Sequence, residues 1–424
     1  MVPAVSPARY PRRAGHRVTP WIDGMPFYQR LQAAAEQATT RFWGVISFVQ
    51  PDFCLPDGTL FWHLMARCAA RGVDVRLLFW RNPQFSMKGH IFQGDAADRA
   101  LLSAQCPAVR ARWDASPDAA HCHHQKAWLV DEVGFVGGMV LSTSTLATPD
   151  HAQGKHDVFA EVTGPAVADV AANFIERWNH AGDPWPSGAR ADDLPAHFPI
   201  PAPAGRSRVQ LTRTVRPGLY GGAAGEGDIH TQYRLAFAAA RHTIYIENQH
   251  PGEIGLLTRL AEALERGVRV VFVVPGEPMA AIRQARTTGA RRYRETFDRL
   301  AALAEHPRFT LAALATHGHE IYTHAKLCIV DGQWTTIGSA NLVDLSLCHD
   351  HTELNLAAWD RGLATQLLGD LFAEHTGEAP PRGDRARLRR LQVCARANTQ
   401  RRARGLPQQG HLYALDPRSY ALDR

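Results

Sequence analysis

The stretch that decides the fold is His123-His124-Gln125-Lys126-Ala127-Trp128-Leu129-Val130-Asp131, which has the form His-x-Lys-x4-Asp. The same form returns 200 positions later as His324-Ala325-Lys326-Leu327-Cys328-Ile329-Val330-Asp331. In extended backbone, residues two apart share a face, so the imidazole of His124 would lie beside the ammonium of Lys126. The apolar run after each Lys is typical of a buried strand. We therefore expect a polar pair at the mouth of a buried strand, twice.

The amino-acid composition makes both lysines unusual. The chain has 47 Lys plus Arg, yet it has only four lysines: Lys88, Lys126, Lys155 and Lys326. Lys offers a compact charge with rotatable donors, whereas Arg is a planar fork. A surface Lys beside a surface His would explain one isolated match. Two matches in equivalent places, from so few lysines, favour a shared chemical role.

The length and net charge of the chain limit the number of domains and the kinds of partner that we expect. A chain of 424 residues suits two or three domains. The net charge of +6 mildly favours anionic partners such as phosphates or membrane headgroups, and is too small to indicate nucleic acid. The first 17 residues do not resemble a signal peptide, and no apolar run is long enough to cross a bilayer. We expect any membrane contact to be peripheral.

The cysteines and the neighbouring histidines do not indicate a metal. Seven Cys are scattered singly, without CxxC spacing, so a disulfide framework or a structural zinc site is not expected and a reducing, cytoplasmic location is. The tract His121-Cys122-His123-His124 has metal-binding residue types. Its neighbours would point to opposite faces of a strand, however, and no second ligand pair accompanies it.

Each motif follows a strand–helix–strand pattern that predicts a parallel sheet with a right-handed crossover. The first copy has a helix at 26–40, a strand at 43–49, a helix at 58–70 closed by Gly72, and a strand at 73–80. The second has a helix at 231–240, a strand at 242–248, a helix at 254–265 closed by Gly267, and a strand at 268–274. Gln50 precedes His124 by 74 positions and Gln249 precedes His324 by 75, which indicates a duplicated domain.

The rest of the chain supplies the boundaries. We expect a poorly ordered tail at 1–19, a first domain at 20–182, a Pro- and Gly-rich linker at 183–206 and a second domain at 207–378. A basic extension follows at 379–424. A solvated helix face is the favoured interpretation of its arginines, and contact with an anionic surface is the alternative.

The paired motifs resemble the HKD motifs of the phospholipase D superfamily. The likeness extends to Ile244–Gln249, to Gly338-Ser339-Ala340-Asn341 and to His156-Asp157, and it covers roughly residues 20–378. The resemblance implies an α/β fold of two similar phospholipase D-like α/β/α sandwich domains, packed with a pseudo-twofold and with the active site at their interface. It also implies catalysis without a metal or other cofactor.

By the same resemblance, His124 is the nucleophile that forms a phosphohistidine, and His324 is the general acid and base. The near-symmetry of the two motifs would also allow the reverse order. A covalent intermediate divides one difficult displacement into two easier ones. Lys126 and Lys326 would hold the phosphate, because a phosphodiester needs cations and donors around its oxygens.

Two carboxylates are expected to orient the histidines. Asp157 lies 33 positions after His124, and Glu353 lies 29 positions after His324, each in a similar strand context. The matching offsets assign Asp157 to His124, in the same half, and Glu353 to His324. The family motif also includes Asp131 and Asp331 among the catalytic residues, although we interpret both as structural acids at strand ends that hold turns and do not touch substrate.

Four further side chains are expected to bind substrate: Asn341, Ser339, Gln249 and Gln50. Gly137-Gly138 and Gly338 would let backbone approach closely, although turn glycines are equally common. Two departures from the family pattern stand out. Val140 replaces a polar residue, which makes the site asymmetric, and Leu345-Ser346 replaces an Arg-Ser pair.

Several functions fit these motifs. The first is phospholipase D-type hydrolysis or headgroup exchange of a phospholipid at a membrane surface, and a cardiolipin synthase-like phosphatidyl transfer differs only in the acceptor alcohol. A metal-independent nuclease is the alternative, and it would need basic and aromatic residues along a groove. A binding protein with dead motifs conflicts with the intact His, Lys, Asp and Asn residues. The sequence leaves the oligomeric state open.

Overall fold

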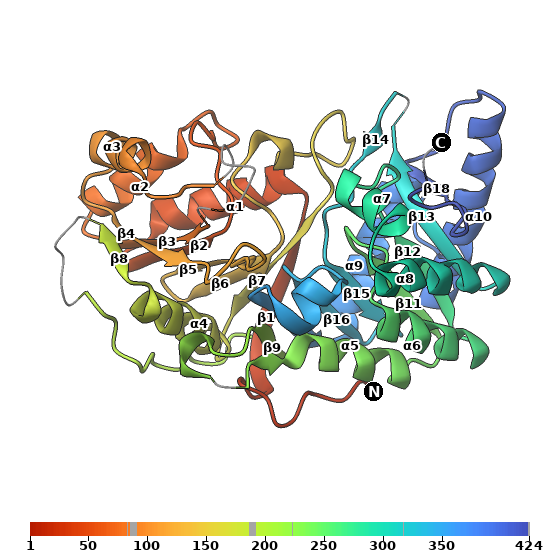
Figure 1. The fold of residues 1–424 in the computed structure, drawn as a ribbon, viewed down its shortest axis with the longest axis horizontal. Helices are drawn as coiled ribbons and strands as arrows, with labels where there is room; N and C mark the ends of the chain where they lie inside the picture. Colours follow the sequence, from red (N-terminus) through yellow and green to blue (C-terminus); the bar gives the residue numbers. More distant parts are fainter. Residues whose placement is uncertain (83, 85–90, 186–191, 223, 317, 423–424) are drawn as a thin grey trace.

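The computed structural model describes residues 1–82, 84, 91–185, 192–222, 224–316 and 318–422. It divides into two halves that lie side by side, each with a mixed sheet (Figure 1). Along the first sheet the strand order is β8 (Asp183–Trp185), β4 (Arg110–Ala115), β3 (Asp74–Arg81), β2 (Arg41–Ile46), β5 (Lys126–Val130), β6 (Val133–Gly137), β7 (Val158–Thr163) and β1 (Arg13–Ile22).

The second half repeats that order strand for strand. Its sheet runs β18 (Leu412–Ala414), β13 (Phe309–Ala315), β12 (Arg269–Val273), β11 (Thr243–Glu247), β15 (Leu327–Val330), β16 (Trp334–Gly338), β17 (Glu353–Trp359) and β9 (Ser207–Val215). In each half three neighbouring strands are parallel, β2 to β4 in the first and β11 to β13 in the second, and the motif strand, β5 or β15, runs antiparallel beside β2 or β11. The duplication expected from the motif spacing is therefore present in the topology.

The expected helices are also present. α2 (Phe61–Ala70) connects β2 to β3, and α6 (Ile254–Glu265) connects β11 to β12. The glycines after these helices, Gly72 and Gly267, have φ values of +83° and +87°. This left-handed backbone favours glycine, because a side chain there is strained, and it ends each helix before the next strand.

Helices cover both faces of each sheet. In β2, Phe42 and Ile46 pack in the cluster of α1 (Gly24–Gln37), α2 and α3 (Ala96–Gln105), whereas Trp43 and Val45 pack in the cluster of α4 (Val167–His180). Side chains two apart on a strand share a face, which explains the division. In the second half the covering helices are α5 (Asp228–Ala239), α6, α8 (Arg291–Ala302), α9 (Arg361–Thr376) and α10 (Asp384–Ala403).

The N-terminal segment joins the halves, and the expectation of a poorly ordered tail was wrong. Residues 13–16 of β1 pair with β9 of the second half, and residues 17–22 pair with β7 of the first. The residues before β1 are held as well, since Val2, Val5 and Tyr10 are buried. The Gln210 side chain contributes by donating to the carbonyls of Val5 and Tyr10, at 3.0 Å each. Burial of three separated apolar side chains offsets the loss of chain freedom.

The expected linker and C-terminal extension pack against the two halves. At the start of the linker β8 pairs with β4, and further on Leu194 and Phe198 pack against the core; residues 186–191 lie outside the described residues. In the extension, α10 buries Leu388, Leu391 and Ala395, while β18 pairs with β13 as β8 pairs with β4. The opposite face of α10 is solvated, as the favoured interpretation expected, and exposes Arg389, Arg390 and Arg396. Within the described ranges, no helix has the length and apolar character needed to cross a bilayer.

Candidate active site

The two motif histidines meet in one pocket between the halves. His124 precedes β5 and His324 precedes β15, and both line a pocket of about 560 Å³. Each histidine keeps only 8% of its surface exposed. Segments that lie 200 positions apart in the sequence thus form a single site, as the expected fold class requires.

The histidine–carboxylate pairs are crossed between the halves. His124 Nδ1 lies 2.9 Å from Glu353 Oε1, and His324 Nδ1 lies 2.6 Å from Asp157 Oδ2. Because a carboxylate only accepts, each Nδ1 is the donor, and each Nε2 is left for the substrate. The expectation that Asp157 orients His124 and Glu353 orients His324 was therefore wrong.

Backbone pairing across the interface explains this exchange. The Thr352 amide donates to the Cys122 carbonyl at 2.9 Å, and the His324 amide donates to the His156 carbonyl at 2.7 Å. Each motif therefore lies against the start of the carboxylate-bearing strand of the other half, β17 or β7. The offsets along the sequence are similar in the two halves, so they could not distinguish pairing within a half from pairing between halves.

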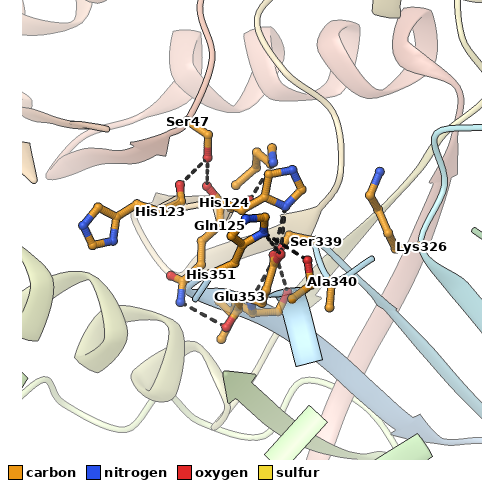
Figure 2. A network of polar contacts seen from close by, with 12 residues as sticks. Ser47, His123, His124, Gln125, Lys326, Ser339, Ala340, His351 and Glu353 are labelled. Atoms are coloured by element: carbon orange, nitrogen blue, oxygen red, sulfur yellow. Dashed lines mark hydrogen bonds and ion pairs between the residues drawn. The ribbon is translucent and has the colours of Figure 1, made fainter. Parts of the chain in front are cut away.

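Glu353 is held by several donors at once (Figure 2). Ser339 Oγ donates to its Oε2 at 2.5 Å, and His351 Nδ1 lies 3.7 Å from its Oε1, in addition to the bond from His124. Burial raises the pKa of this carboxyl, but the His124 imidazole and these hydrogen bonds together hold the pKa well below its usual range. Burial lowers the pKa of His124 to about 4, so its imidazole is neutral near pH 7.

Asp157 has a different environment, although it occupies the equivalent place. Burial raises the pKa of its carboxyl to about 7, while the nearby Lys326 ammonium lowers it. Gly138 stands where the second half has Ser339, and a Cβ there would lie 2.9 Å from both Asp157 oxygens. The close approach expected of the motif glycines is thus real here, and the two halves of the site are not equivalent.

Both motif lysines are buried close to the histidines. Lys126 Nζ donates to the His124 carbonyl at 2.6 Å, and Lys326 Nζ donates to the His324 carbonyl and to Gln249 Oε1, the latter at 3.2 Å. Burial lowers the pKa of Lys126 to about 8 and that of Lys326 to about 7. A bound anion would restore the stability of both charges, so the site is electrostatically suited to a phosphate.

The side chains expected to bind substrate divide into two groups. Gln50, Gln249 and Asn341 line the pocket. In the described part of the chain no donor reaches the buried Asn341 Oδ1, so this amide can turn to present its N–H groups to a ligand. Ser339 differs from the expectation, because its hydroxyl donates to Glu353 and accepts from the Leu354 amide at 3.1 Å. Ser339 therefore positions the Glu353 carboxylate.

Asp131 and Asp331 lie at the far ends of β5 and β15. Asp131 accepts from the amides of Thr39, Thr40 and Arg41 at 2.9–3.0 Å, and Asp331 accepts in the same way from residues 241–243 at 2.7–2.9 Å. Both also have positive φ, 49° and 54°. Their grouping with the catalytic residues was therefore wrong, and the interpretation that they are structural acids is confirmed, because they hold the entry to β2 and β11.

The two departures from the family pattern also have places in the structure. Val140 lines the pocket in the position equivalent to Asn341, so its side chain offers no donor to a phosphate. Ser346 Oγ lies 3.2 Å from His351 Nδ1, and Leu345 lines an apolar pocket beside the site. The amide of Asn341 therefore has no counterpart at the equivalent position of the first half.

Sequence reasoning missed several residues that line the pocket. His351 lies two positions before Glu353, and its ring centroid is 5.7 Å from that of His124. Lys155 lies over the ring of Tyr322, with its Nζ 5.8 Å from the ring centroid. The scarcity of lysine could have indicated Lys155, since it is one of four in the chain. No comparable pattern marks Phe48, whose ring lies 5.6 Å from Lys126 Nζ.

Three groups of His, Asp and Glu residues have ligand atoms close enough to hold a metal ion, within 4.8 Å of one another in the described residues. One consists of His124, His351 and Glu353. In this group both histidines contact the Glu353 carboxylate, as described above. The others share His156, whose two ring nitrogens lie 3.0 Å from Asp23 Oδ1 and 2.9 Å from Glu247 Oε2. Hydrogen bonds satisfy His156 without an ion. In the tract at 121–124, His123 faces Asp114 at 2.9 Å, and its ring centroid lies 4.5 Å from that of His121.

The duplicated fold and its one shared centre of paired His-x-Lys motifs are similar to those of the phospholipase D superfamily. Residues 234–374 match a family model described as "Cardiolipin synthase, PLD-like domain". Phospholipase D A of Dictyostelium discoideum is 26% identical over 80% of this chain. Cardiolipin synthase A of Pseudomonas entomophila is 26% identical over 85% of it. The chain spans 32% of the length of the first relative and 68% of the second.

A solved structure shares the overall fold. Phosphatidylserine synthase of Haemophilus influenzae Rd KW20 superposes with a TM-score of 0.62 and 14% identity, covering 85% of this chain and 86% of its own. At that identity the likeness concerns the fold alone. It agrees with the expected pair of similar α/β/α domains.

Proposed function

We propose that the protein is a phospholipase D-type enzyme that cleaves or exchanges the headgroup of a phospholipid through a phosphohistidine. The observation that carries the proposal is the convergence of His124 and His324 on one pocket. Each histidine has its own carboxylate and its own buried lysine. This arrangement supplies a nucleophile, an acid and two cations for a single phosphodiester.

The walls of the pocket support a lipid as substrate. Beside the polar residues it is lined by Phe48, Val49, Trp80, Met279, Ile282 and Tyr322. Apolar walls around a few convergent polar groups suit a ligand with one charged group and a large apolar part. The names of the similar curated proteins, a phospholipase D and cardiolipin synthases, agree with this substrate class.

In the first step, His124 Nε2 attacks phosphorus while the P–O bond to the leaving alcohol breaks. Glu353 accepts a hydrogen bond from His124 Nδ1 and stabilises the positive charge that develops on the ring. His324 enters this step protonated on both nitrogens, because the anionic substrate favours its imidazolium form, and it donates the Nε2 proton to the leaving oxygen. The two lysines and Asn341 would surround the non-bridging oxygens, where the negative charge is concentrated. The order of the two histidines follows the resemblance, because the crossed pairs are nearly symmetric.

In the second step, water or an alcohol attacks the phosphohistidine and the P–N bond breaks. His324, now neutral, takes the proton of the incoming hydroxyl, with Asp157 fixing its ring. The acceptor decides between hydrolysis and transfer. A phosphatidylglycerol acceptor would make the reaction a cardiolipin synthase-like transfer, which the match of residues 234–374 favours as the second candidate.

One assay tests the proposal. The protein is incubated with phosphatidylcholine vesicles and ethanol in the presence of a chelator, and phosphatidylethanol and free choline are measured. We expect both products, because no step requires a metal. Vesicles with phosphatidylglycerol added test for cardiolipin. Failure with every headgroup, together with cleavage of DNA or RNA, would refute the lipid substrate in favour of a nuclease.

The order of the histidines needs a separate measurement. A short incubation with phospholipid labelled in the phosphate, quenched in alkali, should leave label on His124 in the peptide map. His124→Asn should abolish turnover and labelling, whereas His324→Asn should retain some labelling with a substrate that has a good leaving group. Label on His324 would reverse the assignment.

A further inference from the structure

A second pocket, of about 270 Å³, adjoins the catalytic one in the second half. Most of its lining residues come from α7 (Ala280–Thr287), α8 and the loop that follows β16. Its apolar lining consists of Ala281, Ile282, Ala285, Tyr293, Phe297, Leu342, Val343 and Leu345. None of these residues has a part in the chemistry described above.

The two pockets share a wall. His250, Ala281 and Ile282 line both of them. A ligand whose phosphate lies between His124 and His324 can therefore extend past Ile282 into the second pocket. Ala281 and Ile282, in the first turn of α7, therefore form the boundary between the polar catalytic pocket and the apolar second pocket, which we call the recess.

The two acidic residues of the recess already have partners. Glu253 accepts from the amides of Gly255 and Leu256 at 2.7 and 2.9 Å, and it lies 3.3 Å from His230 Nε2. Asp344 lies 3.9 Å from Arg292. The rest of the wall is mainly apolar, so a sugar or a nucleobase would lose its hydrogen bonds to water there. A hydrocarbon chain loses none.

We propose that this recess receives part of one acyl chain of the phospholipid substrate, an inference that rests on the proposed function. The volume is below that of a pocket for a whole small molecule, which suits a segment of one chain. The outer side of α8 exposes Arg291, Arg292 and Arg294. Their charge is complementary to the phosphates of neighbouring lipids, so the helix that walls the recess can face a lipid surface.

Monomeric short-chain lipids give the sharpest test. A chain that leaves a bilayer gains little in an apolar pocket, whereas a chain that leaves water gains about 0.8 kcal/mol per methylene, or about fourfold in affinity. We therefore compare dibutyryl- and dihexanoyl-phosphatidylcholine below their micelle concentrations. The longer lipid adds two methylenes to the chain in the recess, so kcat/KM should rise about fifteenfold.

Filling the recess should remove that preference. Ala285→Trp places an indole among the lining residues, and the preference for the longer lipid should fall below about threefold. Thr287→Trp adds the same ring on the same helix at an exposed position outside the lining, and it should retain the wild-type preference. Ala285→Leu is a milder filling variant in case the indole prevents folding. An unchanged preference in folded Ala285 variants would overturn the proposal.

A binding measurement separates this proposal from the proposed function. The inactive His124→Asn protein is titrated with a dansyl-labelled medium-chain fatty acid, and the dansyl fluorescence is followed. Binding that Ala285→Trp weakens at least tenfold, and Thr287→Trp does not, supports the recess even if no phospholipid is cleaved. Binding that is absent, or is equal in both variants, would refute it even if phospholipid is cleaved.

Discussion

His124 of the first half donates through Nδ1 to Glu353 of the second half, at 2.9 Å and across 229 positions of sequence. The reciprocal bond joins His324 to Asp157 at 2.6 Å. Neither motif histidine is therefore paired with a carboxylate of its own half. The packing of the two halves and the assembly of the site are a single event, so separate halves would lack both pairs.

Glu353→Gln and Asp157→Asn test the crossed pairs. A neutral amide cannot stabilise an imidazolium, and it can favour the wrong tautomer, so each change should lower kcat about 10²–10⁴-fold. Histidine side-chain NMR distinguishes the partners. Glu353→Gln should move the ring resonances of His124, and Asp157→Asn those of His324.

The reverse pattern of shifts would indicate pairing within each half. Glu36→Gln changes a carboxylate on α1, well away from the two motifs in the sequence, and serves as the control. It should leave both sets of resonances and kcat unchanged.

The motif aspartates should affect stability and leave the chemistry intact. Asp131→Ala leaves the amides of Thr39, Thr40 and Arg41 without their carboxylate acceptor, at a cost of about 1–3 kcal/mol in the free energy of unfolding. Below the unfolding transition, kcat should stay within about twofold of wild type, because Asp131 lies at the far end of β5 from His124. Urea denaturation and phospholipid turnover check the two parts. Glu132→Ala, at the next and exposed position, is the matched control, and a large loss of kcat in folded Asp131→Ala would contradict the assignment.

Most of the architecture could be predicted because local patterns repeat. The glycines at 72 and 267 end equivalent helices, and the two motif strands are apolar at corresponding positions. The crossing of the carboxylates could not be predicted, because it depends on how two similar surfaces pack. Offsets within a chain carry no information on which half a side chain faces.

The N-terminal segment shows a second limit. Its prolines and arginines resemble a solvated tail, yet Val2, Val5 and Tyr10 are buried, and Gln210 binds the backbone of this segment. The partner of the segment lies about 200 residues away, so no window of local sequence reveals it. Ser339 was misassigned for a related reason. Its hydroxyl is adjacent to the site, but its direction is set by Glu353.

Gly138→Ala should disturb the active site by displacing the Asp157 carboxylate. The added Cβ would lie 2.9 Å from both oxygens of Asp157 and 3.1 Å from Lys326 Cδ, so the carboxylate must shift away from its bond to His324. We expect kcat to fall about tenfold to a hundredfold, with a loss of about 1–2 kcal/mol in stability. Gly182→Ala meets nothing within 4 Å and is the control. Wild-type kcat in Gly138→Ala would show that the contact between Asp157 and His324 tolerates displacement.

Lys126→Met should stabilise the protein while it removes activity. Burial lowers the pKa of Lys126 from 10.5 to about 8, so the charged form is disfavoured in the fold relative to the unfolded chain. The cost to stability is complete below the folded pKa, and it is relieved as the pH rises from about 8 to 10.5. Methionine carries no charge, so the variant should exceed wild type by about 1–3 kcal/mol in the free energy of unfolding at about pH 7. The difference should shrink by about pH 10, as guanidinium denaturation at both pH values can show.

In the same variant kcat/KM should fall about 10²–10³-fold, because one of the two cations near the phosphate is lost. Arg389→Met removes an exposed cation from α10 and should change neither quantity. A Lys126→Met protein that is less stable than wild type at neutral pH would mean that Glu353, Asp157 and the other neighbours favour the ammonium more than burial disfavours it.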